Sequence, residues 1–211
     1  MSPQRPFFSG VIMRDPDLQC LIDTTAAAFN ARMTPTSSIA ELNQKFFAAA
    51  AAETGLTGAV SNLEPMPVCH HLAPALVTAA TGSVETSNVA DALSHLMPRL
   101  CWRPRITGKH DPEGFSGNHA NTTLIGNGGL EERDDIRMGL SLIAPQTTYP
   151  DHQHPPEEMY LVLSPGEWRN DDMDWHEPGI GGVVHNPPGI VHAMRSGRAP
   201  LLALWCLWSP P

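Results

Sequence analysis

The second half of the sequence consists of short runs of β-forming residues separated by Gly and Pro. After about residue 100 these runs are NTTLIG, IRMGLSLIAP, EMYLVLSPG, GGVVHNPPG, VHAMRSG and LLALWCLW. Short strands with frequent turn signals are typical of a small sandwich or barrel. The segment SGRAP, between the last two runs, predicts a hairpin. We therefore expect a β-barrel over residues 106–211.

The first half reads as helices. In LQCLIDTTAAAF the apolar residues recur on one helical face. Ser38 and Glu41 resemble a capping box that opens a second helix, which ends at Gly55. Two further helical segments are PVCHHLAPALVTAATG, where Pro74 could introduce a kink, and SNVADALSHLMP. The patterns predict a helical region over residues 1–105 that packs on the barrel, in an α+β chain that is mainly β.

Composition excludes several classes of partner. The formal net charge is −9 and the only lysines are Lys45 and Lys109, so no basic cluster is available to bind nucleic acid. No apolar run is long enough to span a membrane, and the N-terminus lacks the pattern of a signal peptide. Four scattered cysteines without a C-x-x-C pair are typical of reduced thiols. We expect a cytoplasmic protein that binds neither membranes nor nucleic acid.

The stretch YPDHQHPPEEMY, residues 149–160, contains both tyrosines of the chain. If it is extended, His152, His154, Glu158 and Tyr160 share one face, although two prolines interrupt the middle. Two imidazoles, a carboxylate and a phenol on one face suit a divalent metal ion. A solvated surface loop is the other interpretation of the same residues.

Together with the segment GGVVHNPPGIVHAMRS, this stretch resembles the two motifs of the cupin family. The spacing H-x-H-x3-E of the first motif is present, and Gly166 follows one residue later than usual. The second motif, G-x5-P-x-G-x2-H-x3-N, matches at Gly181, Pro187, Gly189 and His192, with Ser196 in the last position. The resemblance implies a cupin double-stranded β-barrel, or jelly roll, that binds one metal ion at its mouth.

Carried over by position, the family's metal ligands are His152, His154, Glu158 and His192. His152 is the least secure of them, because three protein ligands plus water leave the open coordination position that catalysis needs. Iron(II), zinc and manganese all suit such a His/Glu site. The nearby His176 and His185 are interpreted as ordinary loop or strand histidines.

The helices-then-barrel order and the two tyrosines resemble the cupin-type dimethylsulfoniopropionate (DMSP) lyases of marine bacteria, most closely the Q type (DddQ). The resemblance implies cleavage of DMSP to dimethyl sulfide and acrylate by β-elimination. It makes Tyr149 the candidate general base. It leaves Tyr160 to bind the metal, to orient the substrate or to share the role of base.

The reaction explains why these residue types are useful. The proton next to the DMSP carboxylate is weakly acidic, and a Lewis-acidic metal that holds the carboxylate oxygens can take up the developing charge. A phenol whose pKa is lowered by a nearby cation provides a base stronger than a carboxylate. The sulfonium needs an aromatic seat, for which Trp205 and Trp208 are candidates. Because they lie three residues apart, at most one of them should line the barrel.

Other cupin functions fit less well or stay open. Sugar-phosphate isomerases need a basic group, yet Arg169 is the only Lys or Arg between Met138 and Met194. Thiol dioxygenases resemble a three-histidine site without an acid. The alternatives are another metal-dependent oxygenase or lyase acting on a small carboxylate, and a non-catalytic cupin that binds a small molecule. The helical region could serve as a lid over the barrel or as the contact of a homodimer.

Overall fold

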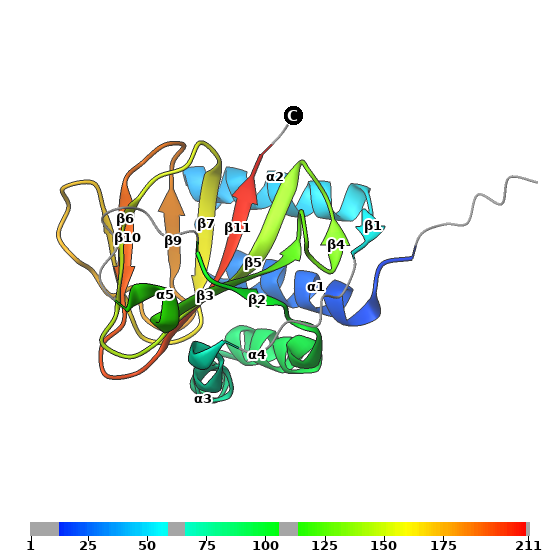
Figure 1. Ribbon diagram of the computed structural model, residues 1–211. Coiled ribbons are helices and arrows are strands. Elements are labelled where there is room, and N and C mark those ends of the chain that lie inside the picture. Colours follow the sequence, from blue (N-terminus) through cyan, green and yellow to red (C-terminus); the bar gives the residue numbers. More distant parts are fainter. Residues whose placement is uncertain (1–12, 59–65, 106–113, 210–211) are drawn as a thin grey trace, which may run out of the picture.

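We describe a computed structural model that covers residues 13–58, 66–105 and 114–209 (Figure 1). The segment on which the expectation of no signal peptide depends lies largely outside the described residues. The division into residues 1–105 and 106–211 stays a prediction. Among the described residues, no helix has the length and apolar character needed to cross a membrane. All four cysteines are free thiols.

Helices dominate the N-terminal half, as the sequence predicts. The α-helices of the described residues are α1 (Pro16–Asn30), α2 (Ser38–Ala52), α3 (Leu72–Ala79), α4 (Val84–Leu96) and α5 (Phe115–Asn118), with 3-10 helices η1 (Pro67–His71) and η2 (Met97–Arg99). Helix α1 begins where Asp15 accepts hydrogen bonds from two first-turn amides and Pro16 occupies the first turn. Helix α4 begins at the capping residue Ser83, whose hydroxyl accepts from the amide of Thr86.

Strands form two sheets. The described strands are β1 (Leu56–Thr57), β2 (Trp102–Arg103), β3 (His119–Ile125), β4 (Glu131–Glu132), β5 (Ile136–Ile143), β6 (Thr148–His152), β7 (Glu157–Val162), β8 (Glu167–Asn170), β9 (Val183–Asn186), β10 (His192–Arg195) and β11 (Leu201–Trp208). The larger, eight-stranded sheet has the order β1-β4-β3-β5-β11-β7-β9, and β2 pairs with β3 beside this path. The smaller sheet has the order β6-β10-β8. The expected double-stranded barrel is confirmed.

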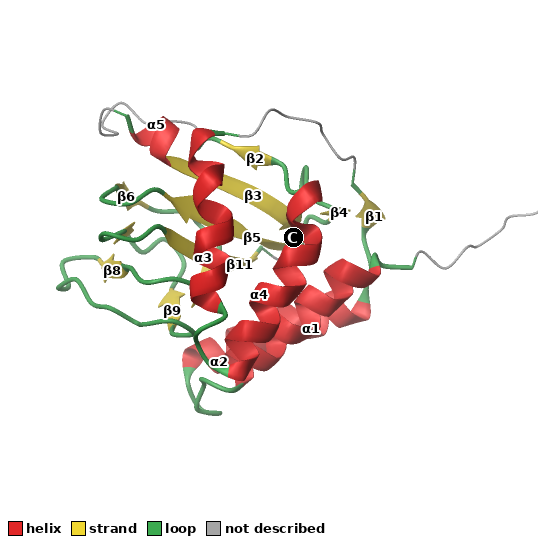
Figure 2. Ribbon diagram, turned by 90° about the horizontal axis from the view of Figure 1, so that it is seen from below, coloured by secondary structure: helices red, strands yellow, loops and turns green. Residues whose placement is uncertain are grey.

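The larger sheet lies between the helices and the smaller sheet (Figures 1 and 2). Alternation along β11 explains how one strand serves both sides: Leu202 and Leu204 belong to the core shared with the helices, whereas Leu201 and Ala203 belong to the core between the sheets. We call the core between the two sheets the inner core. Its buried residues are Phe115, Ile143, Tyr149, Tyr160, Val162, Trp168, Val184, Met194, Leu201, Ala203 and Trp205.

Two details of the helices differ from the sequence patterns. The residue that precedes α2 is Ser37, not Ser38, and its side chain makes no capping hydrogen bond. Ser38 instead lies in the first turn with its hydroxyl 3.3 Å from His185 Nδ1, so the expected capping box is not formed. Pro74 causes no kink inside a long helix, because it lies in the first turn of α3, where the missing N–H costs no intrahelical hydrogen bond.

The predicted hairpin at SGRAP was also wrong. Strand β10 before this turn pairs with β6 and β8, whereas β11 after it pairs with β5 and β7. The turn therefore carries the chain from the smaller sheet to the larger one. Ser196, in this turn, donates to the carbonyl of Ala144 at 2.6 Å and accepts from the amide of Thr147 at 3.0 Å. These bonds fix the crossing between the sheets.

Candidate metal centre

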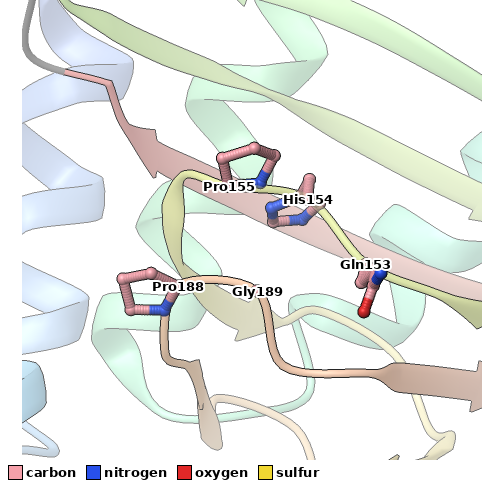
Figure 3. Close-up of a pocket in the computed structure, with 5 residues that line it drawn as sticks. All are labelled: Gln153, His154, Pro155, Pro188 and Gly189. Atoms are coloured by element: carbon pink, nitrogen blue, oxygen red, sulfur yellow. The ribbon is translucent and has the colours of Figure 1, made fainter.

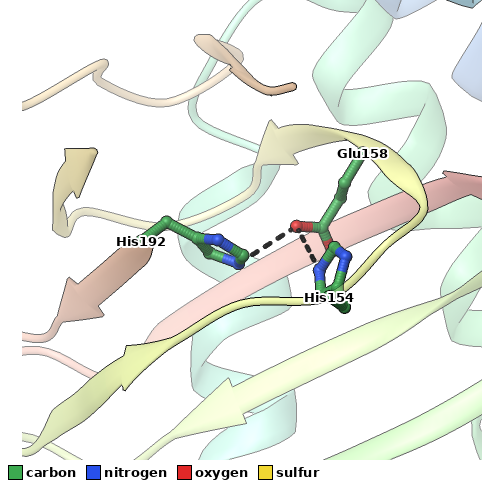
Figure 4. Close-up of side chains that lie close together, drawn as sticks. All are labelled: His154, Glu158 and His192. Atoms are coloured by element: carbon green, nitrogen blue, oxygen red, sulfur yellow. Dashed lines mark hydrogen bonds and ion pairs between the residues drawn. The ribbon is translucent and has the colours of Figure 1, made fainter. Parts of the chain in front are cut away.

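Three of the predicted ligands meet between the two sheets. His154 lies in the loop between β6 and β7, Glu158 on β7, and His192 at the start of β10. One ligand atom from each lies within 4.8 Å of the others (Figure 4). His154 Nε2 is 3.2 Å and His192 Nε2 is 3.3 Å from Glu158 Oε2. We call these three residues the His/Glu cluster.

The histidine rings are oriented by the backbone. His154 Nδ1 is 3.0 Å from the carbonyl oxygen of Pro156, and His192 Nδ1 is 3.0 Å from that of Ile190. Each Nδ1–H therefore donates to the chain, which turns Nε2 toward Glu158. Such a bond on one ring nitrogen sets the tautomer and leaves the other nitrogen to bind a metal.

The cluster fits a divalent cation. The buried His192 Nε2 has no hydrogen-bond partner of adequate geometry among the described residues, although it faces the carboxylate. Buried nitrogens rarely lack a partner, and a cation between the imidazoles and Glu158 would provide one. Two imidazoles and a carboxylate suit iron, zinc and manganese alike.

Glu158 is buried, yet it is stabilised as a carboxylate. Burial raises its pKa, but the neighbouring imidazoles of His154 and His192 outweigh this effect and bring the pKa to about 2. Asn186, on β9, donates from Nδ2 to Glu158 Oε2 at 2.8 Å. Burial of Tyr160, together with the negative charge of Glu158 beside it, raises the pKa of the phenol well above 10. The carboxylate is thus fixed from several sides.

His152 lies beside the cluster but outside it. Its ring centroid is 4.0 Å from that of His192 and 6.3 Å from that of His154. Its Nδ1 is 2.9 Å from the carbonyl oxygen of Pro150. Burial and the His192 ring lower the pKa of His152 to about 3, and Arg105 adds to this decrease. His152 therefore lines the site as a neutral ring.

Residues 149–160 do not form one continuous strand, and the break falls at the two prolines noted in the sequence. Strand β6 ends at His152, and Pro155 and Pro156 separate it from β7. Glu158 and Tyr160 do share one face of β7, as alternation predicts, and both are buried. The break places His154 in a loop, from which it still reaches Glu158.

Tyr149 is packed in a column of rings. Its centroid is 4.2 Å from that of His152, 4.6 Å from that of His119 and 5.3 Å from that of Phe115. The guanidinium carbon of Arg105 lies 4.9 Å from the Tyr149 ring centroid. The column connects the start of β3 to the His/Glu cluster through His152.

Only one of the two tryptophans reaches the inner core. Trp205 belongs to it and is 9% exposed, whereas Trp208 packs against the core on the helix side. Trp205 pairs in register with Gly139 on β5, where an added Cβ would lie 2.3 Å from the indole. Glycine is thus required for the indole to lie against β5. Trp208 does not line the site, because alternation points it the other way.

The cluster opens to a cavity. Gln153, His154 and Pro155 line one side of it, and Pro188 and Gly189 the other (Figure 3). The cavity has a volume of about 490 Å³, which is in the range of small-molecule sites. Of the three cluster residues, His154 lines this cavity.

Sequence reasoning missed Asn186, Arg105 and His119. Asn186 follows the predicted motif glycine by five residues, but an asparagine in a strand carries no signal of its own. Arg105 and His119 reach the site only through the pairing of β2 with β3. His185 was interpreted as an ordinary strand histidine. Its Nε2 is 2.8 Å from Glu157 Oε1, outside the cluster. His176 forms a backbone bridge with Trp168.

Comparison with known proteins identifies the family. The family model for dimethylsulfoniopropionate lyase matches residues 42–203. The chain is 30% identical over 147 residues to the protein assigned as DMSP lyase DddL in Cereibacter sphaeroides, and this match spans 60% of that relative's length. It is 32% identical over 174 residues to the DMSP lyase DddQ of Ruegeria pomeroyi, which is 78% of this chain and 85% of that protein.

Solved structures agree on the fold. The crystal structure of DddQ from Ruegeria pomeroyi superposes with a TM-score of 0.70 at 23% identity and covers 93% of both chains. A chain from the crystal structures of the DMSP lyases RdDddP and RnDddQII gives a TM-score of 0.68 at 22% identity and covers 92% of both chains. With the family match over most of its length, the chain belongs to the dimethylsulfoniopropionate lyase family, whose named members are carbon–sulfur lyases.

Proposed function

We propose that this protein is a metal-dependent lyase that cleaves DMSP to dimethyl sulfide and acrylate. The observation that carries the proposal is the His/Glu cluster, next to two buried tyrosines in a chain of the DMSP lyase family. The substrate is inferred from membership of the family, and the metal dependence is inferred from the two histidines and the glutamate of the cluster.

His154, Glu158 and His192 would hold the metal ion, with Nδ1–H bonds and Asn186 fixing their orientation. When bound, a divalent cation supplies Lewis acidity that stabilises negative charge on the substrate carboxylate. Glu158 is ionised in any case near neutral pH, because its pKa is about 2. The protein therefore presents a carboxylate ligand without having to remove a proton from it.

The reaction requires a base and a leaving group. The base removes the proton from the carbon next to the carboxylate, and the electron pair of that C–H bond forms the new double bond. The C–S bond breaks with its pair on sulfur, so dimethyl sulfide leaves as a neutral molecule. The proton remains on the base, and the remaining product is acrylate.

Tyr149 is our candidate base, and Tyr160 our candidate orienting residue. The Tyr149 ring packs on His152, next to the cluster. Tyr160 shares one face of β7 with Glu158 and lies close enough to this carboxylate to feel its charge. A positioned base contributes about 10²- to 10⁴-fold to the rate. The face of Trp205 in the inner core offers the sulfonium an electron-rich seat.

Headspace detection of dimethyl sulfide tests the proposal. Metal-loaded protein incubated with DMSP should release dimethyl sulfide and acrylate in equal amounts, without oxygen uptake. Chelated protein and the Glu158→Ala variant serve as controls and should release neither product. Oxygen consumption coupled to turnover would favour an oxygenase instead. Binding of DMSP without any product would indicate a non-catalytic cupin.

A further inference from the structure

A second polar cluster lies on the opposite face of the two strands that carry Glu158 and Asn186. Side chains alternate along a strand, so the preceding residues, Glu157 on β7 and His185 on β9, point the other way, toward the helices. Met159, which pairs in register with His185, belongs to the core shared with the helices and agrees with this direction. The two faces of the same strand pair therefore carry two separate sets of reactive side chains.

Three side chains form a hydrogen-bonded chain where the start of α2 meets β7 and β9 (Figure 1). Ser38 Oγ lies 3.3 Å from His185 Nδ1, and His185 Nε2 lies 2.8 Å from Glu157 Oε1. A carboxylate can only accept, so Nε2 carries the proton of the neutral imidazole, and Nδ1 is left to accept from the Ser38 hydroxyl. We call Ser38, His185 and Glu157 the serine triad.

The serine triad has a reactive end that solvent can reach and a base that is held in place. Ser38 is exposed, whereas the side chains of His185 and Glu157 are 19% and 22% exposed. Within the described part of the chain, His185 is the only ion-pair partner of Glu157, so the charge of this carboxylate is directed at the imidazole. A nucleophile, a base within reach of it and a third group that orients the base are the parts that nucleophilic catalysis requires.

The backbone at the start of α2 provides hydrogen-bond donors next to the Ser38 hydroxyl. Ser37, the residue before the helix, makes no capping bond, and its hydroxyl donates to the carbonyl of Thr34 instead. Among the described residues, the amides of Ser38 and Ile39 have no acceptor in the protein. These two donors, at the positive end of a 15-residue helix, suit the negative oxygen of a tetrahedral intermediate.

We propose that Ser38 is the nucleophile of a second, metal-independent active site that hydrolyses small uncharged esters, with His185 as its general base. The hydroxyl oxygen attacks the ester carbonyl carbon while its proton passes to His185 Nδ1. The C–O bond to the leaving group breaks, and the leaving alkoxide takes the proton from His185. Water then attacks the acyl-serine, gives a proton to His185, and releases the carboxylic acid as Ser38 Oγ regains that proton.

Charge limits the substrate class. Glu157 belongs to the triad, and Glu41 lies in the same first turn of α2 as Ser38. In a chain of net charge −9, these carboxylates disfavour an anionic ester. Neither the metal nor DMSP takes part in the reaction, so the inference does not depend on the proposed lyase function.

Labelling of the metal-loaded protein with a fluorophosphonate, which phosphonylates activated serines, tests the proposal. Peptide mass spectrometry should place the adduct on Ser38. His185→Ala should slow labelling about 100-fold, because the general base is removed. Glu157→Gln should also slow it, because the new amide can donate to Nε2 and so move the ring proton to Nδ1. Ser37→Ala, at the neighbouring serine that contacts Thr34, is the matched control and should be labelled like the wild type.

Hydrolysis of p-nitrophenyl acetate should follow the same order among the variants, and Ser38→Ala should be as slow as His185→Ala. The absence of an adduct on Ser38 would overturn the proposal, and so would wild-type labelling of Ser38 in a folded His185→Ala protein. If the wild type is not labelled and Ser38→Ala only lowers the thermal midpoint, the three residues merely attach α2 to the barrel. None of these readouts depends on the release of dimethyl sulfide.

Discussion

Asn186 donates its side-chain amide to Glu158 Oε2 over 2.8 Å, and both residues are buried. The bond connects adjacent strands, since Glu158 on β7 lies directly opposite Asn186 on β9. It holds the only carboxylate of the cluster in one orientation. Partners of this kind act on metal affinity without touching the metal.

Replacing Asn186 should therefore weaken metal binding while the fold survives. We expect Asn186→Ala to lower metal affinity about 10- to 100-fold, as measured for other outer-shell partners. Competition with a chromophoric chelator measures the affinity. Asn127→Ala, in an exposed turn, is the control. Unchanged affinity in Asn186→Ala would show that Glu158 is held by its other neighbours alone.

His152 and His154 should behave differently although they are two residues apart. The structure places His154 in the cluster and His152 outside it. We expect His154→Ala, Glu158→Ala and His192→Ala each to lose bound metal, and His152→Ala to retain it. Metal analysis by mass spectrometry after desalting gives the stoichiometry. A metal-free His152→Ala protein would make His152 a fourth ligand.

The two tyrosines form a second matched pair. Tyr149→Phe should lower kcat at least about 100-fold with metal content unchanged, because a general base is removed. Tyr160→Phe should have the smaller effect, since we assign it to orientation. Rates of dimethyl sulfide release and metal content are measured on the same samples. The reverse order of effects would transfer the role of base to Tyr160.

Replacing Trp205 and Trp208 in turn distinguishes a residue that binds the substrate from one that only packs in the core. Trp205→Leu should raise KM for DMSP roughly 2- to 30-fold, the range that a cation–π contact allows. Trp208→Leu should leave KM unchanged and lower the thermal midpoint, because its ring packs on the helix side. Equal effects on KM would argue against an aromatic seat at Trp205.

An ion pair far from the site predicts a pH dependence of stability. Arg133 donates to both carboxylate oxygens of Asp135, at 2.8 and 2.6 Å, and also to the carbonyls of Glu53 and Ala49 at the end of α2. The hydrogen bond from Arg133 lowers the pKa of Asp135 below 3.8. The unfolded chain therefore binds more protons near this pH, and stability falls as the pH decreases.

Asp135→Asn should lower the free energy of unfolding at pH 7 by about 1.5 to 3 kcal/mol. The difference from wild type should be complete above pH 3.8 and disappear as the pH falls through the lower folded-state pKa. Urea denaturation at a series of pH values measures it. Asp134→Asn, at the exposed neighbouring position, is the control. A difference that does not depend on pH would mean that packing, and not the charge, is lost.

The members of the His/Glu cluster could be found in the sequence because their spacing is local and their residue types are specific. His154, Glu158 and His192 fall in two short motifs, and alternation on β7 correctly pairs Glu158 with Tyr160. The barrel was predictable for a similar reason, since turn signals bound nearly every long strand.

The errors have a common physical cause: local patterns do not specify which distant segment a strand or side chain will meet. The turn at SGRAP reads as a hairpin, but nothing in it shows that β10 and β11 pair with different sheets. Arg105 and Asn186 reach the site through strand pairing alone. Consecutive serines at the start of α2 left the capping position ambiguous by one residue.

Glu158 and His192 belong to different sheets of the barrel. A metal ion bound by both residues would therefore link the larger sheet to the smaller one. Metal binding would then be coupled to the stability of the barrel, since a ligand bound only by the folded form stabilises that form by mass action. Removing a bound ion should therefore lower the stability of the folded barrel.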